Sequence, residues 1–206
     1  MADRRFLFQR ILKEGVKEGF PPGLTQEARK WYRERSQELK DIRPERLMRR
    51  PGAIANQRSY FYRIGEMYLF RYEPRDKMDK KKLPYYDRFP LIIVTRVEKE
   101  WFEGINFHYL MYEHRAMLMD RMYRFLNSDD FNNPNTRLMT LKWNRLERIG
   151  SRKYQRSCVR RYINNQVRGK FIKILPAEWD LCLMLPIERF IGASRNKVWT
   201  EGRQKW

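Results

Sequence analysis

Apolar residues recur at helical spacing in the first quarter of the chain. The pattern predicts a helix that begins after an N-cap at Thr25 and ends near Lys40. Its apolar positions are Ala28, Trp31, Tyr32 and Leu39.

The segments on either side of this helix lack such a pattern. The first is basic and closes on Pro21-Pro22-Gly23, and the second is interrupted by Pro44 and by Pro51-Gly52. We therefore expect the first quarter to build no core of its own and its first 24 residues to be dispensable for folding but not for assembly. The predicted organisation is a basic N-terminal arm, then a helix and linker, then a core domain, at residues 1–24, 25–60 and 61–206.

The middle of the chain alternates in the manner of strands. Three segments are rich in aromatic or β-branched residues and predict strands: GEMYLFRYEP (65–74), FPLIIVTRVE (89–98) and INFHYL (105–110). Glu103-Gly104 reads as a turn before the last of them. A helix with an apolar face is predicted from about Tyr112 to Leu126. Neighbouring strands joined by short loops predict an α+β fold, with a small antiparallel sheet or barrel wrapped by helices.

Further elements are predicted towards the C-terminus. RLMTLKW (137–143) and FIKIL (171–175) fit strands, 146–150 fits a helical turn, and PAEWDLCLML fits a helix that begins near Pro176. Ser194 is a suitable cap for a last short helix.

The polar and apolar residues of 157–168 fall on opposite sides when this segment is placed on a helix. Ser157 would cap this helix and Gly169 would end it. One arc carries Arg160, Arg161, Asn164, Asn165 and Arg168, and the other carries Cys158, Val159, Tyr162, Ile163 and Val167.

Positive charge is concentrated in the same part of the chain. The whole chain carries +20, from 45 Lys/Arg and 25 Asp/Glu. Residues 137–173 hold twelve Lys/Arg against the single acid Glu147, a net of +11. An ordinary solvated helix would mix the two signs, and like charges at helical spacing repel. This excess therefore indicates an anionic partner, most simply double-stranded DNA, with an anionic membrane surface as the weaker alternative.

Arginine suits a phosphate contact because its planar fork pairs bidentately with phosphate oxygens. We expect the segment 137–173 to face DNA without reading its sequence, since no base-reading module is present. Tyr154 and Trp143 could stack on bases, although packing is the better explanation for each. The candidate phosphate-binding residues are Arg145, Arg148, Arg152, Lys153, Arg156, Arg160, Arg161, Arg168 and Lys170.

Catalytic and metal-binding patterns are weak. His108 and His114 lack metal-ligand spacing, and Cys158 and Cys182 are expected to be reduced core thiols. We therefore expect no enzyme activity, no cofactor, no metal, no small-molecule substrate and no membrane partner. A DNA-processing nuclease stays as an alternative, because carboxylates distant in sequence can converge on a metal ion. The candidates are Asp76, Asp79, Asp87, Asp120, Asp129 and Asp130.

Several motifs resemble a family of virion proteins from T-even-like contractile-tailed bacteriophages. The similar segments are the run from GEMYLFRYEP to LPYYDRFPLIIV, EGINFHYL, a helix with Arg115 near its start, and PAEWDLCLMLPIERF with KVW, over roughly residues 60–200. The chain departs from the family at Met111-Tyr112, where a pair of prolines is expected. The family is that of the DNA end protector and head-completion proteins.

The resemblance implies a function that agrees with the charge distribution. A member would be a virion protein at the head–tail junction, present in the host cytoplasm during assembly, that meets other virion proteins and shields the genome end from host exonuclease. The alternatives are a structural neck or baseplate component and, third, the nuclease. Within LPYYDRFPLIIV we expect packing by the aromatic residues and a turn hydrogen bond at Asp87.

Overall fold

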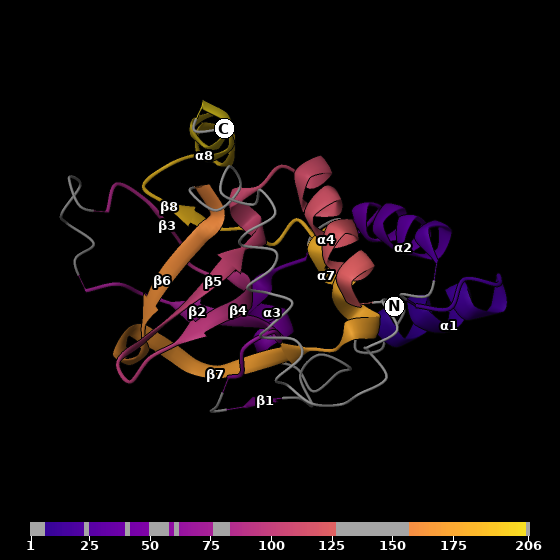
Figure 1. Ribbon diagram of the computed structural model, residues 1–206, viewed down its shortest axis with the longest axis horizontal. Coiled ribbons are helices and arrows are strands. Elements are labelled where there is room, and N and C mark those ends of the chain that lie inside the picture. The colour runs from indigo at the N-terminus through magenta and orange to yellow at the C-terminus, as the bar shows by residue number, and fades with distance from the viewer. Residues whose placement is uncertain are drawn as a thin grey trace.

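Six antiparallel strands form the main sheet of the protein (Figure 1). A computed structural model describes residues 7–22, 25–39, 42–49, 58–59, 62–75, 83–126 and 157–204. The strand order is β1-β7-β2-β4-β5-β6, and a separate pair is formed by β3 and β8. The strands are β1 Arg58–Ser59, β2 Met67–Tyr72, β3 Tyr86–Asp87, β4 Leu91–Val97, β5 Trp101–Asn106, β6 Val159–Ile163, β7 Val167–Ile174 and β8 Phe190–Ile191.

Both faces of this sheet are buried, which explains its nearly continuous apolar strands. One face carries Met67, Leu69 and Ile93, which belong to a core shared with the helices. The opposite face carries an aromatic cluster in which the rings of Phe70 and Tyr162 lie 5.2 Å apart. The alternation of strand side chains assigns neighbouring residues to the two cores.

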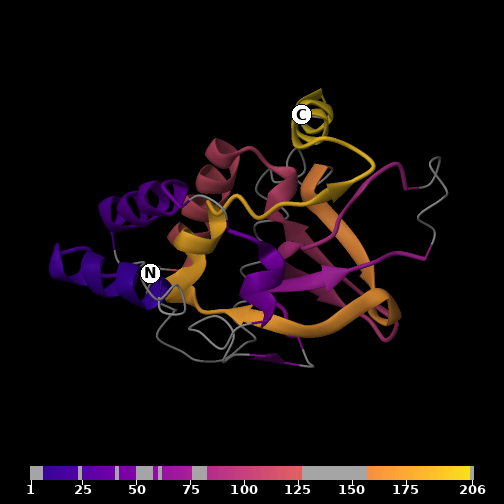
Figure 2. The ribbon, with the colours of Figure 1, turned by 180° about the vertical axis from the view of Figure 1, so that it is seen from behind.

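The sheet coils strongly but stays open. Strands β6 and β7 are separated by three strands in the sheet order, yet a single 3-10 turn, η5 (Asn164–Gln166), connects them (Figure 2). In the described part of the chain, β1 and β6 are the two edges. The α+β prediction is confirmed, as an open sheet and not as a closed barrel.

Helices cover the first face of the sheet. In Figure 1, α4 and α7 lie next to the sheet, and α2 and α1 lie outside them. The helical elements are α1 Leu7–Lys17, α2 Gln26–Gln37, α3 Pro44–Arg49, η3 Phe107–Tyr109, α4 Tyr112–Leu126, η6 Pro176–Glu178, α7 Trp179–Leu183 and α8 Arg195–Gln204. None of the described helices is long and apolar enough to cross a membrane.

Several local predictions are confirmed. Thr25 caps α2 by accepting a hydrogen bond from Ala28 N at 3.1 Å, and Ser194 Oγ accepts one from Lys197 N at 3.3 Å before α8. The helix α4 has the predicted bounds, so Met111-Tyr112 starts it without the prolines. These features depend on residues close together in the chain.

The N-terminal residues contribute to the core. Ile11 of α1 is 2% exposed and belongs to the main core, and the Tyr32 hydroxyl donates towards the Leu12 and Phe20 carbonyls, at 3.2 and 2.9 Å. These contacts attach α1 and α2 to the main core of the protein and not to a separate core of the first quarter. The segment 41–60 is also not all linker, because it contains α3 and β1. The division into three parts stays a prediction.

No turn forms at Glu103-Gly104, because both residues lie within β5. The hairpin turns at 98–101, where Glu98 N donates to Trp101 O at 2.9 Å. A Cβ on Gly104 would come within 2.6 Å of Ile93 O, so this glycine permits close approach of β4. The strand expected over 105–110 ends at Asn106, whose side chain accepts from His108 N and starts η3.

The helix expected over 157–168 is wrong. These residues form the last part of one helical turn, then β6, η5 and the start of β7. Pairing with β5 places Glu103 opposite Arg161 and Gly104 opposite Arg160, so the two arginines point to opposite faces. The β-branched residues favour this strand, and the ladder with β5 outweighs the helical pattern. The predicted strand at 137–143 and turn at 146–150 lie outside the described residues.

Candidate nucleic-acid interface

Part of the basic segment can be placed in the fold. Of its twelve Lys/Arg, the described residues include five: Arg160, Arg161, Arg168, Lys170 and Lys173. The remaining candidates lie outside the described residues, so their contact with DNA stays a prediction. They are Arg145, Arg148, Arg152, Lys153 and Arg156, with the possible stacking residues Trp143 and Tyr154.

Arg160 is engaged within the protein. Its guanidinium carbon lies 4.0 Å from the centroid of the Tyr109 ring, and Nη2 donates to Ser157 O at 2.9 Å. Tyr109 is 5% exposed, and burial raises its pKa. These contacts fasten β6 to η3, so the geometry favours a structural role for Arg160.

Arg161 lies on the other face of β6 and is 58% exposed. Its Nη2 lies 3.3 Å from Glu103 Oε2, and its guanidinium carbon lies 4.1 Å from the centroid of the Trp101 ring. An exposed ion pair of this kind contributes little to stability. The charge of Arg161 is therefore partly neutralised but the side chain is still accessible.

Arg168, the second residue of β7, is an exposed cation that makes no ion pair with another described residue. Its cross-strand neighbour on β2 is Arg71, which pairs with Glu73 at 2.5 Å. Gly169 follows with φ of 84°, a backbone conformation that favours glycine. Like charges directly opposite on neighbouring strands are destabilising unless an anion lies between them. The register thus places two arginines where a phosphate could bind.

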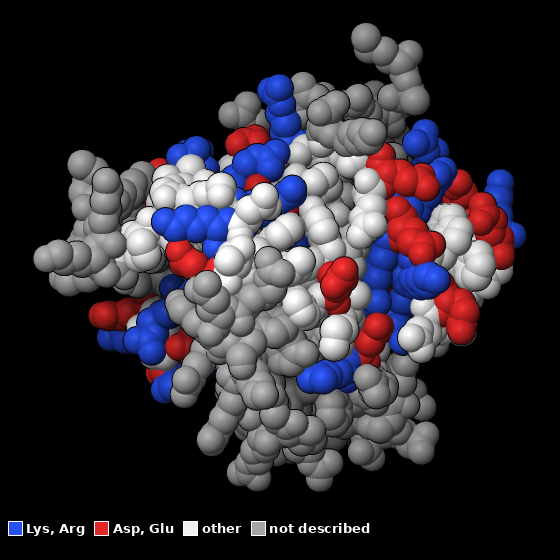
Figure 3. Space-filling view, turned by 90° about the horizontal axis from the view of Figure 1, so that it is seen from above, with Lys and Arg blue, Asp and Glu red and all other residues white. Residues whose placement is uncertain are grey.

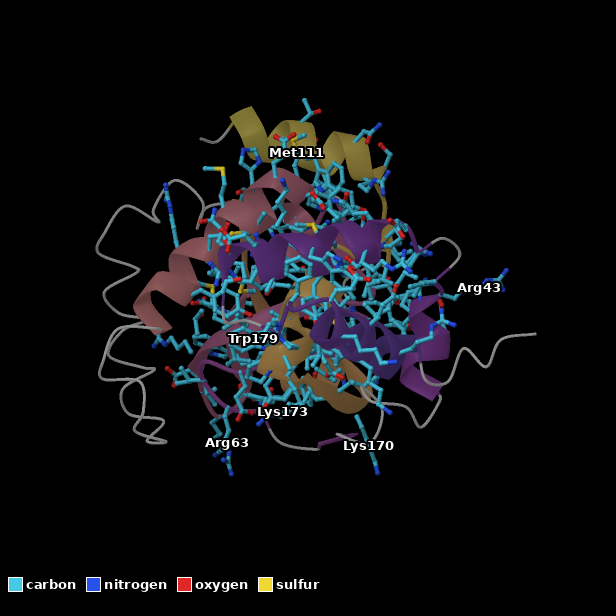
Figure 4. The ribbon with its side chains drawn as sticks, turned by 90° about the vertical axis from the view of Figure 1, so that its right-hand side faces the viewer. Arg43, Arg63, Met111, Lys170, Lys173 and Trp179 are labelled. Atoms are coloured by element: carbon cyan, nitrogen blue, oxygen red, sulfur yellow. The ribbon has the colours of Figure 1, made fainter. Side chains whose placement is uncertain are left out.

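Three more cations lie along one edge of the molecule. In Figure 4, Arg63, Lys170 and Lys173 follow the lower edge, and Arg63 and Lys170 extend away from the ribbon. Lys173 pairs with Glu66 at 2.5 Å. Arg63 and Arg71 lie outside the basic run of the sequence; the strand register brings Arg71 beside Arg168, and Figure 4 places Arg63 on the same edge as Lys170.

The face of the molecule seen from above is mixed in sign over its described part. Figure 3 shows Lys/Arg and Asp/Glu side chains interspersed over the described part of the face seen from above. Such a face lacks the single-sign field that concentrates a polyanion. The described candidates for phosphate contacts are the β7 cations Arg168 and Lys170, with Arg63 beside them. We call this group the β7 edge of the molecule, although β7 is an interior strand of the sheet.

Asp87 forms a buried polar centre. Its Oδ1 accepts from Phe89 N at 3.1 Å, which confirms the expected turn hydrogen bond, and from Arg189 N at 3.4 Å. Its Oδ2 accepts from Asn106 Nδ2 at 3.0 Å and lies 2.7 Å from His108 Nδ1. Asp87, Asn106 and His108 are at most 2% exposed. The LPYYD and GINFHYL motifs therefore meet in the interior, where they hold β3, β8 and η3 together.

Of the remaining candidates for chemistry, Asp120 and the two cysteines lie in the described part of the chain and are engaged or buried. Asp120 pairs with Arg29 and Arg33, and both cysteines are buried, as expected. Burial raises the pKa of Cys158 to about 12 and that of Cys182 as well. Among the described residues, no three His, Cys, Asp or Glu side chains form a group that could hold a metal ion. The candidates Asp76, Asp79, Asp129 and Asp130 lie outside these residues.

Comparison with known proteins agrees with the motifs. No curated protein and no solved structure matches the chain. A family model described as the phage T4 terminal DNA protecting protein matches residues 24–203, which is most of the chain and includes every strand of both sheets. The chain therefore belongs to the bacteriophage family of the phage T4 terminal DNA protecting protein.

Proposed function

We propose that this protein binds the end of the phage genome at the head–tail junction and shields it from host exonuclease by occupying it. The observation that carries the proposal is the family match over residues 24–203. Shielding of this kind needs a firm grip on the duplex and no chemical step. The partners are double-stranded DNA and other virion proteins of the junction.

The grip consists of sequence-independent phosphate contacts. Residues 148–173 contain no acid, and within them Arg168 and Lys170 lie on the β7 edge. Arg63 adds a cation from the segment before β2, whereas Arg71 opposite Arg168 is already paired with Glu73. We propose phosphate contacts for these cations and for the basic residues of 137–156. The contacts of Arg160 support a structural role for that residue instead.

Electrophoretic mobility shifts test the proposal. Linear duplex should bind more tightly than a closed circle of the same sequence, with or without Mg²⁺. Bound linear DNA should also resist an exonuclease that loads at duplex ends, while an endonuclease still cuts its interior. Equal cutting of bound and unbound DNA by the exonuclease would contradict the shielding role.

The same assay separates the two alternatives. A neck or baseplate component without a DNA role should fail to bind duplex at moderate salt. A nuclease should cleave the linear DNA when Mg²⁺ is added. Each of these results would replace the proposed function.

A double variant, Arg168→Glu with Lys170→Glu, tests the phosphate contacts directly. Each lost contact releases one counterion fewer, so the slope of log K against log salt should flatten by about 0.9 per contact. The double variant should therefore flatten it by roughly 1.8. A matched control is Lys197→Glu on α8, whose side chain is 62% exposed and should leave the slope unchanged. An unchanged slope in the double variant would remove the β7 edge from the interface.

A further inference from the structure

A tryptophan at the tip of the β4–β5 hairpin carries two arginine side chains over its ring. The guanidinium carbon of Arg161 lies 4.1 Å from the centroid of the Trp101 ring, and that of Arg96 lies 5.1 Å from it. Both arginine side chains are more than half exposed, at 58% and 61%. Ile163, itself 40% exposed, is the cross-strand neighbour of Trp101 on β6. We call Arg96, Trp101, Arg161 and Ile163 the Trp101 platform.

The Trp101 platform lies on the face of the sheet that the helices cover further along β5 and β6. Along β5 and β6 the cross-strand pairs are Trp101 with Ile163, then Glu103 with Arg161, then Ile105 with Val159. The last pair packs against the helix-covered core, whereas the first pair lies at the hairpin tip, where the face is accessible. Ile163 is 40% exposed and Trp101 is partly buried, so the accessible surface of the platform comes mainly from the isoleucine and the two arginine side chains.

The cations of the platform are already paired. Arg96 lies 2.8 Å from Glu98, and Arg161 lies 3.3 Å from Glu103. Paired cations attract few phosphates and release few counterions. The chemistry that the platform offers is therefore a flat layer of indole and guanidinium, and not an additional phosphate clamp.

The platform lies close to the β7 edge. Asn164 of η5 donates from its backbone N to Glu100 O at 2.9 Å and from Nδ2 to Lys99 O at 3.1 Å, which holds the hairpin tip against η5 (Figure 1). Arg168 follows Asn164 by four residues, a span of at most about 14 Å. Base pairs repeat every 3.4 Å along a duplex, so this span corresponds to roughly four steps.

We propose that the Trp101 platform stacks on the terminal base pair of duplex DNA while Arg168 and Lys170 hold phosphates a few steps inward. The inference rests on the proposed binding of a DNA end. The interior base pairs of a duplex are stacked on both sides, and only the last pair presents an open aromatic face. Phosphate contacts are the same at the end and in the interior, so a stacking surface is what distinguishes an end.

The test compares two duplexes of one sequence, one with open blunt ends and one with both ends sealed by loops. Base–aromatic stacking contributes roughly 1–3 kcal/mol per base, which corresponds to about 5- to 140-fold in affinity. The wild-type protein should prefer the open duplex by a factor in this range. Trp101→Leu should lose the preference, and Trp101→Phe, which keeps an aromatic face, should retain most of it. Met117→Ala on α4, at a methionine that is 46% exposed, is the control and should keep the preference unchanged.

The outcomes separate the inference from the proposed function. A wild-type protein that binds both duplexes equally well would contradict end binding, and the inference would fall with it. End preference that persists in Trp101→Leu would overturn the platform and leave the proposed function standing. A changed sedimentation state in Trp101→Leu would assign the platform to a contact between copies of the chain, which also overturns it. Trp101→Leu should further keep the salt slope of the wild-type protein, because no phosphate contact is lost.

A second measurement keeps the test valid if Trp101→Leu does not fold. The wild-type protein is titrated against duplexes that carry 2-aminopurine at the terminal position or at an internal position. Stacking on the indole should quench the terminal probe and leave the internal probe nearly unchanged. Equal responses of the two probes would overturn the inference without any variant.

Discussion

Single residues in this protein are held in place by buried hydrogen bonds more often than the sequence indicates. Asp87 looks like an ordinary turn residue, yet its carboxylate accepts from Phe89 N, Arg189 N and Asn106 Nδ2 and lies beside His108 Nδ1. A buried donor that loses its acceptor costs about 1–3 kcal/mol. The LPYYD and GINFHYL motifs therefore contribute to the stability of the fold.

Asp87→Ala should destabilise the protein by about 3 kcal/mol or more, because it leaves several buried donors without an acceptor. Urea denaturation measures the loss. Glu34→Ala on α2, where the side chain is 63% exposed, is the control and should change the free energy of unfolding by less than about 0.5 kcal/mol. Equal stability of the two variants would show that the Asp87 contacts contribute little.

At the scale of elements, charged side chains fasten α2 to the helices beside it. Arg33 Nε lies 2.7 Å from Asp180 on α7, and Arg33 Nη2 lies 2.9 Å from Asp120 on α4. Arg29 joins Asp120 at 3.3 Å. The alternating acids and bases of this segment are typical of a solvated helix, but Arg29 and Arg33 are buried and only part of the helix faces solvent.

Arg33→Ala should cost about 3–5 kcal/mol, because it leaves Asp180 without its buried arginine and leaves Asp120 with Arg29 alone. The exposed pair of Lys30 and Glu34 on the same helix provides the control, and Lys30→Ala should cost at most about 1 kcal/mol. Chemical denaturation of both variants tests the difference. A small loss in Arg33→Ala would mean that the two aspartates find water or other partners.

Deletion of residues 1–24 should lower the melting temperature by about 3–12 °C. Burial of Ile11 contributes roughly 1.5–3 kcal/mol, and the Tyr32 hydroxyl loses two acceptors. Ile11→Ala should reproduce much of the effect, whereas Lys13→Ala at an exposed position should not. Circular dichroism melts measure all three proteins. A truncated protein that melts like the full chain would restore the view of this segment as a detached arm.

At the scale of the whole molecule, a coiled sheet separates two cores of different composition. One is mainly aliphatic, includes some aromatic residues and is shared with the helices, and the other is dominated by aromatic rings that pack edge to face around Phe70 and Phe102. Edge-to-face packing adds to the stability that burial of the rings provides. The basic β7 edge and the Trp101 platform lie where the coiled sheet turns from β6 into β7, so the fold brings them together.

Stability should fall as the pH rises above about 10. Burial raises the pKa of many tyrosines, while tyrosines in the unfolded chain ionise near pH 10. A raised pKa in the folded state means that this stability is fully present below pH 10 and is lost as the pH rises through the folded values. The tyrosines concerned are Tyr32, Tyr62, Tyr68, Tyr85, Tyr109, Tyr112, Tyr123 and Tyr162.

Urea unfolding at pH 8, 9, 10 and 11, with absorbance at 295 nm, measures this effect. Tyrosine ionisation should coincide with unfolding in one cooperative step. Ionisation of all tyrosines near pH 10 in a chain that stays folded would contradict the burial of the aromatic core.

Much of the architecture could be predicted from the sequence, because it depends on residues that are close together in the chain. The cap at Thr25, the bounds of α4 and the strands β2 and β4 follow from spacing within a few residues. The motifs likewise indicated the family. Local propensity, capping and periodicity are sufficient for such features.

Only the tertiary structure decided the conformation of residues 157–168 and the contacts that their charged side chains make. The segment fits a helix when taken alone, but a ladder with β5 satisfies its backbone and separates Arg160 from Arg161. Likewise, Arg33 forms a hydrogen bond with Asp180, which is 147 positions away in the sequence, and the Trp101 ring contacts Arg161, which is 60 positions away. Contacts of this range depend on strand register and on the coiling of the sheet, which no short window of sequence contains. For this reason the sequence determined that the protein is basic and α+β, and the fold determined which cations face solvent.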